Sequence, residues 1–259
     1  MRENDLQWPR RLHTLVVVNA NRAASRIVSE TILVTGFEPF GGIVGNPTMD
    51  IVAALHGGRV DGRQVVGRIL PVVYDGHRER LKSLMDEVDP ALVIGFGLDL
   101  NAENIRVETC AVNRAHFDIA DNAGALLRDA EIHAGGPSYR ISTFPADEIC
   151  AALAMAGIAA EQSGDAGRYL CNATLFHLLE LSAKKPAPAL CGFIHVPPST
   201  EQRAASQDDR LDTGRAMPLA TMVQAARLIL RETSAAARRD LAAARPEWRA
   251  SAPLQMALR

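Results

Sequence analysis

A regular alternation of short apolar runs with longer amphipathic stretches constrains the fold of this chain more than any other feature. The runs Thr31–Thr35, Ala91–Ile94 and Leu190–Val196 are apolar and rich in β-branched residues, which is typical of strands buried on both faces. Between the first two, Leu81, Leu84, Met85 and Val88 follow helical spacing. This alternation predicts an α/β fold, a single-domain three-layer α/β/α sandwich with a mostly parallel central sheet.

The other elements follow from the same patterns and from turn residues. Asn46-Pro47 is a helix start, with Asn as the N-cap and Pro at the first helical position. Further strands are expected over Val65–Val73, Ile105–Asn113 and near Ile158–Glu161, and helices from Asn46 to His56 and over Asp75–Val88, Pro145–Met155, Tyr169–Ala183 and Leu219–Arg231. Residues 114 to 140 are expected to form a long loop, since they contain turn residues at Asp121-Asn122 and Gly135-Gly136-Pro137.

The 259 residues suffice for one domain with extended ends. We expect an N-terminal extension over residues 1–29, an α/β domain over 30–232 and an Ala/Arg-rich tail over 233–259 with a helical pattern up to Pro246.

Composition excludes several classes of function. The net charge of −2 lacks the basic excess of a protein that binds nucleic acid or an anionic membrane surface, so neither partner is expected. The four cysteines form no C-x-x-C pair and are too sparse for a disulfide scaffold, which favours a reducing, cytoplasmic location. No apolar run approaches the roughly 18 residues of a membrane span, and the N-terminus shows no signal-peptide pattern.

Topology brings one cysteine close to one histidine. In such a sheet, ligands bind at the carboxyl ends of the strands. The helix from Cys171 to Lys184 leads about 20 Å away from that edge, and the strand from Ala189 to His195 returns about 20 Å. Cys171 and His195 should therefore lie at the same edge of the sheet.

These two residue types suit nucleophilic catalysis. A thiol in the first turn of a helix is stabilised as thiolate by the positive end of the helix dipole. His195 could pair with that thiolate and then protonate a leaving amine. A third group should orient the imidazole, and spacing alone leaves Asp99, Glu103, Glu108 and Asp118 as candidates.

Four segments, in order, carry a resemblance to a known family. They are Gly36-Phe37-Glu38-Pro39-Phe40-Gly41-Gly42 with Asn46-Pro47, Val107-Glu108 with Ala111 and Asn113, Ala166-Gly167-Arg168-Tyr169-Leu170-Cys171-Asn172, and Phe193-Ile194-His195-Val196-Pro197. Together they resemble the signatures of pyroglutamyl-peptidase I, a family of cysteine peptidases.

The resemblance implies a role for each matched residue. It makes Cys171 the nucleophile, His195 the general base and acid, and Glu108 the group that orients the imidazole. The implied reaction removes N-terminal pyroglutamate (5-oxoproline) from a small peptide with a blocked N-terminus, through a thioester. Phe37, Phe40, Asn46 and Ile119 resemble positions in or near the family's substrate pocket. The resemblance further implies no metal, no cofactor and a homo-oligomer.

One segment departs from the family. Where the family usually has a Gly-Gln-Ala-Gly-Gly-Arg type of loop, this chain has Gly97-Leu98-Asp99-Leu100-Asn101-Ala102, and Thr109 stands where an arginine commonly follows the catalytic glutamate. Two alternatives therefore stay open, a related cysteine hydrolase that acts on a different capped peptide or small amide, and a non-catalytic binding relative. A nucleoside phosphorylase shares the general architecture, but no glycine-rich phosphate loop with basic partners supports it.

The other cysteines and histidines have no such context. Packing explains Cys110, Cys150 and Cys191, because a cysteine in an α/β core is most often a small buried apolar residue. Core or surface placement suffices for His13, His56, His77, His116, His133 and His177.

Overall fold

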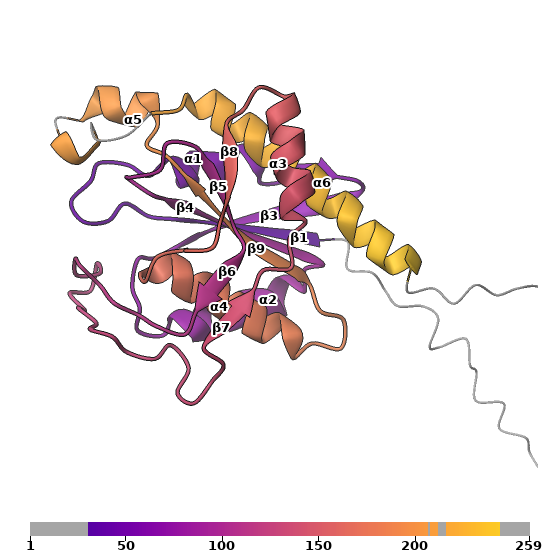
Figure 1. Cartoon of the computed structure of the whole chain (residues 1–259), viewed down its shortest axis with the longest axis horizontal. Coiled ribbons are helices and arrows are strands. Elements are labelled where there is room, and N and C mark those ends of the chain that lie inside the picture. The colour runs from indigo at the N-terminus through magenta and orange to yellow at the C-terminus, as the bar shows by residue number, and fades with distance from the viewer. Residues whose placement is uncertain (1–30, 207, 212–215, 244–259) are drawn as a thin grey trace, which may run out of the picture.

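A computed structural model describes residues 31–206, 208–211 and 216–243, which form a seven-stranded sheet between two layers of helices (Figure 1). The strands are β1 (Thr31–Phe37), β2 (Arg59–Val60), β3 (Arg63–Leu70), β4 (Leu92–Leu98), β5 (Ile105–Glu108), β8 (Ala160–Ser163) and β9 (Leu190–Val196). Their order is β2-β3-β1-β4-β9-β5-β8. The pairs β3/β1, β1/β4, β4/β9 and β5/β8 are parallel, whereas β2 pairs antiparallel to β3 and β5 antiparallel to β9.

The helices cover both faces of this sheet. On one face lie α1 (Pro47–Leu55), α3 (Ala146–Met155) and α6 (Leu219–Ala243), and on the other lie α2 (His77–Val88) and α4 (Leu170–Ala183) (Figure 1). Each face has its own apolar core, one around Ile32, Ile94 and Ile229, the other around Leu33, Phe176 and Phe193. The predicted three-layer, mostly parallel α/β fold is confirmed.

The predicted start of α1 is confirmed in detail. The Asn46 side chain accepts a hydrogen bond from the Thr48 N–H at 3.1 Å, and Pro47 occupies the first helical position, where a missing N–H costs nothing. The predicted strand Leu190–Val196 is β9 with the same bounds.

The strand expected over Ile105–Asn113 and the helix expected over Asp75–Val88 differ from their expected bounds. The strand expected over Ile105–Asn113 is two strands, β5 and β6 (Cys110–Val112), and β6 pairs with β7 (Tyr139–Ile141) in a separate two-stranded sheet. The break lies at Thr109, whose N–H and hydroxyl both bond to the Ser163 carbonyl, at 2.7 Å and 2.9 Å. Helix α2 begins at His77 instead of Asp75, because Gly76 has a φ of 65°, outside the helical region.

The helix expected over Leu219–Arg231 is longer than expected and continues into the tail, where the sequence has a helical pattern up to Pro246. Helix α6 runs beyond Arg231 to Ala243, and Thr233, Ser234, Ala236 and Ala237 are buried. The expected boundary at residue 232 therefore falls inside a helix. The N-terminal extension, residues 1–29, and the end of the tail lie outside the described residues. The remaining short elements are α5 (Thr200–Ala205) and a 3-10 turn at Asp209–Leu211. Within the described residues no helix has the length and apolarity to cross a bilayer.

Candidate active site

Cys171 lies in the first turn of α4, a helix buried on nearly all sides. The neighbouring Asn172 fixes this turn against β6. Its side-chain oxygen accepts from the Val112 N–H at 2.8 Å, and its amide donates to the carbonyls of Val112 and Arg114 at 2.9 Å and 3.0 Å. These three hydrogen bonds of one side chain hold the helix start, and with it the thiol, against the strand β6 and the residues that follow it.

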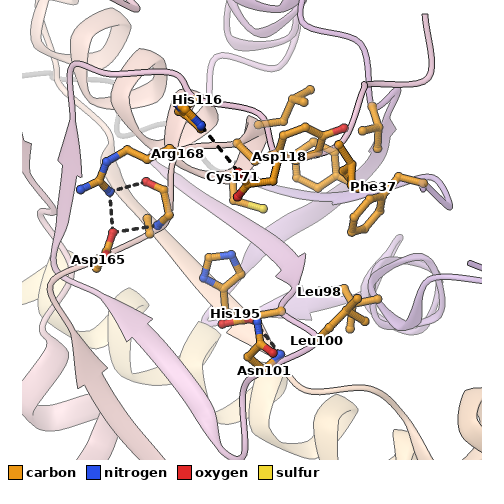
Figure 2. Close-up of a pocket in the computed structure, with 18 of the residues that line it drawn as sticks. Phe37, Leu98, Leu100, Asn101, His116, Asp118, Asp165, Arg168, Cys171 and His195 are labelled. Atoms are coloured by element: carbon orange, nitrogen blue, oxygen red, sulfur yellow. Dashed lines mark hydrogen bonds and ion pairs between the residues drawn. The ribbon is translucent and has the colours of Figure 1, made fainter. Parts of the chain in front are cut away.

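His195 lies near the carboxyl end of β9, in the centre of the sheet, and is 5% exposed. Across the parallel β4/β9 pair it stands opposite Gly97. His195 and Cys171 line the same cavity. The predicted meeting of Cys171 and His195 at one sheet edge is what the structure shows (Figure 2).

Glu108 reaches the same histidine from the other side. Because β5 runs antiparallel to β9 with Arg106 opposite His195, Glu108 lies two residues along on the same face of the sheet. The Glu108 Oε1 to His195 Nδ1 distance is 2.8 Å, and Glu108 is fully buried. Of the four carboxylates left open by spacing, Glu108 forms this bond to the imidazole.

Arg106 could have competed for this carboxylate, since it shares a strand face with Glu108. Its Nε lies 3.8 Å from Glu108 Oε1, whereas its Nη1 donates to Asp99 at 2.6 Å and its Nη2 to Ser163 Oγ at 2.7 Å. Asp99 and Ser163 thus hold the guanidinium, and the short bond of Glu108 is the one to His195.

The surroundings of His195 favour its charged form. Burial alone would lower its pKa, but the electrostatic interaction with Cys171, together with the hydrogen bond to Glu108, outweighs burial and raises the pKa to about 10. The imidazole of His195 therefore keeps its proton over the neutral pH range.

Gly97 lets the thiol approach the sheet. A Cβ at this position would lie 2.8 Å from Cys171 Sγ and 2.7 Å from the Phe193 ring, well inside van der Waals contact. A glycine is needed here because of this close approach.

A cavity of about 740 Å³ opens over Cys171 and His195 (Figure 2). Phe37, Phe40, Asn46 and Ile119, the four residues expected near a substrate, all line it. They differ in exposure. Phe37 is 3% exposed, with its ring 6.4 Å from that of Phe193, while Ile119 is 41% exposed at the rim.

Asn46 lines the cavity, but its polar atoms are engaged. Its Oδ1 accepts from Thr48, and its Nδ2 donates to the Glu38 carbonyl at 3.2 Å. Its contribution to the cavity is thus to fix the loop that follows β1.

Sequence reasoning missed one aromatic wall. The Tyr169 ring lies 6.0 Å from that of Phe40 and 4.5 Å from that of Phe117, and it lines the cavity beside Cys171. Burial, with Asp121 and Cys171 nearby, raises the pKa of its phenol to about 12, so it stays neutral. Its place next to the nucleophile in the sequence could have indicated this role.

Charged residues line the opposite side of the cavity. Arg168 pairs with Asp165 at 2.6 Å, and His116 pairs with Asp129 at 2.9 Å. The cavity therefore has an apolar side and a polar side, with the thiol and imidazole between them (Figure 2). In the part of the chain that the structure describes, no group of His, Cys, Asp and Glu side chains could hold a metal ion.

A thiol at a helix start, beside an imidazole that is hydrogen-bonded to a buried carboxylate, is an arrangement typical of enzymes that cleave amides through a cysteine nucleophile. Comparison with known proteins narrows the class. The family model described as pyroglutamyl peptidase matches residues 30–236.

Individual relatives agree with the family model. The pyrrolidone-carboxylate peptidase of Pyrococcus furiosus is 42% identical over 171 residues, which cover 66% of this chain and 82% of that protein. The enzyme of the same name from Thermococcus onnurineus is 37% identical over 201 residues, or 77% of this chain and 96% of that protein. The solved pyrrolidone carboxyl peptidase of P. furiosus matches with a TM-score of 0.75 and 35% identity over 80% of this chain and 99% of that chain. The chain belongs to the pyroglutamyl peptidase family and is a cysteine-type peptidase.

Proposed function

We propose that this protein removes N-terminal pyroglutamate from small peptides, with Cys171 as nucleophile, His195 as general acid and base, and Glu108 as the group that orients the imidazole. One observation carries the proposal. The thiol and the oriented imidazole lie at the floor of a cavity whose apolar side has the size and character for a neutral lactam ring.

The proposed reaction starts from the thiolate, which is the nucleophilic form of a cysteine. The Cys171 thiolate attacks the carbonyl carbon of the pyroglutamyl group, and the carbonyl oxygen becomes an oxyanion. The N–H groups of the first turn of α4 have no acceptors within the helix, so they can stabilise that charge. The His195 imidazolium then gives its proton to the departing nitrogen, the C–N bond breaks, and a thioester remains on Cys171.

Hydrolysis of the thioester reverses these roles. His195, now neutral, takes a proton from a water molecule that attacks the thioester carbonyl. The C–S bond breaks, pyroglutamate leaves, and the thiolate and imidazolium are restored. In both steps Glu108 accepts the hydrogen bond from His195 Nδ1–H, which fixes the tautomer and stabilises the imidazolium.

Substrate selection follows from the two sides of the cavity. Phe37, Phe40 and Tyr169 offer aromatic walls to a ring that has neither charge nor free amine. The charged side, with Arg168 and Asp165, is left for the residue that follows the pyroglutamate.

The residues at 97–102 favour one alternative substrate class. Leu98 is 6% exposed in the cavity wall, and Asp99 in the same loop is held by Arg106, where the family usually has a glutamine and an alanine. This wall differs from the usual family wall in polarity at position 98 and in charge at position 99. The difference supports a second candidate function, hydrolysis of a different capped peptide or small amide by the same three residues.

Release of a fluorophore from a pyroglutamyl conjugate under reducing conditions tests the proposal. The intact protein should turn over the conjugate, and Cys171→Ala should not, while Cys191→Ala, which removes a buried thiol that is not among the cavity-lining residues, should keep activity. Turnover by Cys171→Ala would overturn the assignment of the nucleophile. No turnover by the intact protein, with rapid alkylation of Cys171 alone, would favour the alternative substrate.

We further propose a cytoplasmic location, because a thiolate nucleophile needs a reducing environment. Self-association into a homo-oligomer is a prediction that sedimentation of the full chain tests.

A further inference from the structure

A buried histidine that the proposed mechanism does not use lies directly behind the aromatic side of the cavity. His77 is the first residue of α2 and is 1% exposed. Its ring is stacked on that of Phe37, with centroids 6.4 Å apart and an interplanar angle of 21°. Its Nε2 lies 2.7 Å from Thr174 Oγ1, one turn into helix α4.

The bonds of Thr174 define the tautomer of this histidine. The Thr174 hydroxyl donates to the Leu170 carbonyl at 2.7 Å, so its one proton is already engaged. The oxygen must then accept, and His77 Nε2 must carry a proton. Nδ1 is buried without a hydrogen-bond partner, as expected for the unprotonated nitrogen of a neutral ring. Burial, with His177 and Arg80 nearby, lowers the pKa of His77 to about 3, which agrees with a neutral ring.

The chain of bonds ends beside the nucleophile. Leu170 directly precedes Cys171 in the first turn of α4, and its carbonyl is the acceptor in the chain from His77 through Thr174. The same imidazole supports Phe37, a wall of the cavity. His77 thus contacts Thr174, in the helix that carries the nucleophile, through its Nε2–H. Through its ring face it contacts Phe37, a wall of the substrate pocket.

We propose that His77 is a positioning residue that sets the nucleophile helix and the Phe37 wall relative to each other. The proposal rests on the proposed function for its kinetic readouts. It assigns two separable roles, a hydrogen bond that acts on Cys171 and a ring face that acts on substrate binding, and the two can be removed one at a time.

Two variants separate these roles. His77→Phe keeps a ring against Phe37 but removes the donor to Thr174, so kcat and the rate of Cys171 alkylation by iodoacetamide should fall about 10-fold while KM changes less. His77→Gln keeps a donor but removes the ring, so KM should rise about fivefold while kcat and alkylation change less.

Variants of the partner test the hydrogen bond from the other side. Thr174→Val leaves the Nε2–H without an acceptor and should lower kcat and alkylation as His77→Phe does, whereas Thr174→Ser should restore both. The matched control is His177→Phe. His177 is a second buried histidine, 6.5 Å from His77, but it faces Glu180 and is not among the cavity-lining residues, so its removal should leave both parameters unchanged.

Thermal unfolding of each variant completes the experiment. If His77→Phe and His177→Phe lose kcat and alkylation rate equally, and in step with their loss of unfolding temperature, the proposal is overturned, because such losses would reflect only core packing. So would unchanged kcat and alkylation in both His77→Phe and Thr174→Val. If His77→Phe does not fold, the Thr174→Val and Thr174→Ser pair decides. Alkylation needs no substrate, so failure of pyroglutamyl turnover in the intact protein would be recognised separately.

Discussion

Glu108 and His195 are joined across two antiparallel strands by a 2.8 Å hydrogen bond inside a sheet that is otherwise mostly parallel. The second carboxylate oxygen of Glu108 is buried without a partner, and Arg106 stands 3.8 Å from the first. Burial of a carboxylate costs free energy unless other polar groups bind it. Because Glu108 has so few other polar partners, its hydrogen bond to the imidazolium is the main interaction that offsets this cost.

Replacing Glu108 by Gln should lower kcat about 100-fold or more, since a neutral amide cannot stabilise the imidazolium or fix its tautomer. Steady-state kinetics on a pyroglutamyl conjugate measures the loss. Glu161→Gln is the control, because Glu161 is exposed on the neighbouring strand β8. Activity of Glu108→Gln within threefold of the parent would show that another group orients His195.

Replacing Gly97 by Ala should remove activity without unfolding the protein. The new Cβ would lie 2.8 Å from Cys171 Sγ and 2.7 Å from the Phe193 ring, so the thiol must move away from its position. We expect at least a 100-fold loss in kcat and a slower reaction of Cys171 with iodoacetamide. Gly164→Ala, where nothing lies within 4 Å of the added Cβ, should behave as the parent. Equal alkylation rates in Gly97→Ala and the parent would contradict the close approach.

Much of this site can be predicted from the sequence because helix and strand lengths determine where a chain returns. The rise per residue of a helix and a strand places Cys171 and His195 at one edge, and both lie there. The N-cap at Asn46 is likewise a local property of Asn followed by Pro.

The approach of Glu108 is different, because it depends on the direction of β5, which long-range pairing determines. The break at Thr109 depends on Ser163, more than fifty residues away in the chain, and no local pattern indicates it. His77 carries no sequence motif either. Its contacts with Phe37 and Thr174 exist only after α2 and α4 pack on the same face of the sheet.

Replacing Asp99 by Asn should move the alkaline limb of the pH profile of kcat/KM to lower pH. Asp99 accepts a hydrogen bond from Arg106 at 2.6 Å. Asn binds the guanidinium more weakly than Asp does, so Arg106 can interact more strongly with the Glu108 carboxylate, which lies 3.8 Å away. His195 would then lose part of the support that, with Cys171, outweighs burial and raises its pKa to about 10. Asp118→Asn, which removes an exposed carboxylate at the cavity rim, is the control and should leave the limb in place. An unchanged limb in Asp99→Asn would show that Arg106 does not act on Glu108.

The free energy of unfolding should fall between about pH 6.5 and about pH 5 because two histidines are buried in neutral form. Burial lowers the pKa of His77 to about 3 and that of His177 to about 4, the latter despite Glu180. In the unfolded chain both protonate near pH 6.5, so the unfolded state binds more protons and stability falls as the pH falls, by about 1.5 kcal/mol per histidine over this interval. Burial raises the pKa of Glu180, but the hydrogen bonds to Arg78 and Lys184 outweigh burial and lower the pKa. Glu180 therefore contributes a loss of stability only as the pH falls below its ordinary pKa of 4.5. Urea unfolding at both pH values measures the difference, and His177→Phe should reduce it by about half. Equal unfolding free energies at the two pH values in the parent would show that these histidines are not buried as neutral rings.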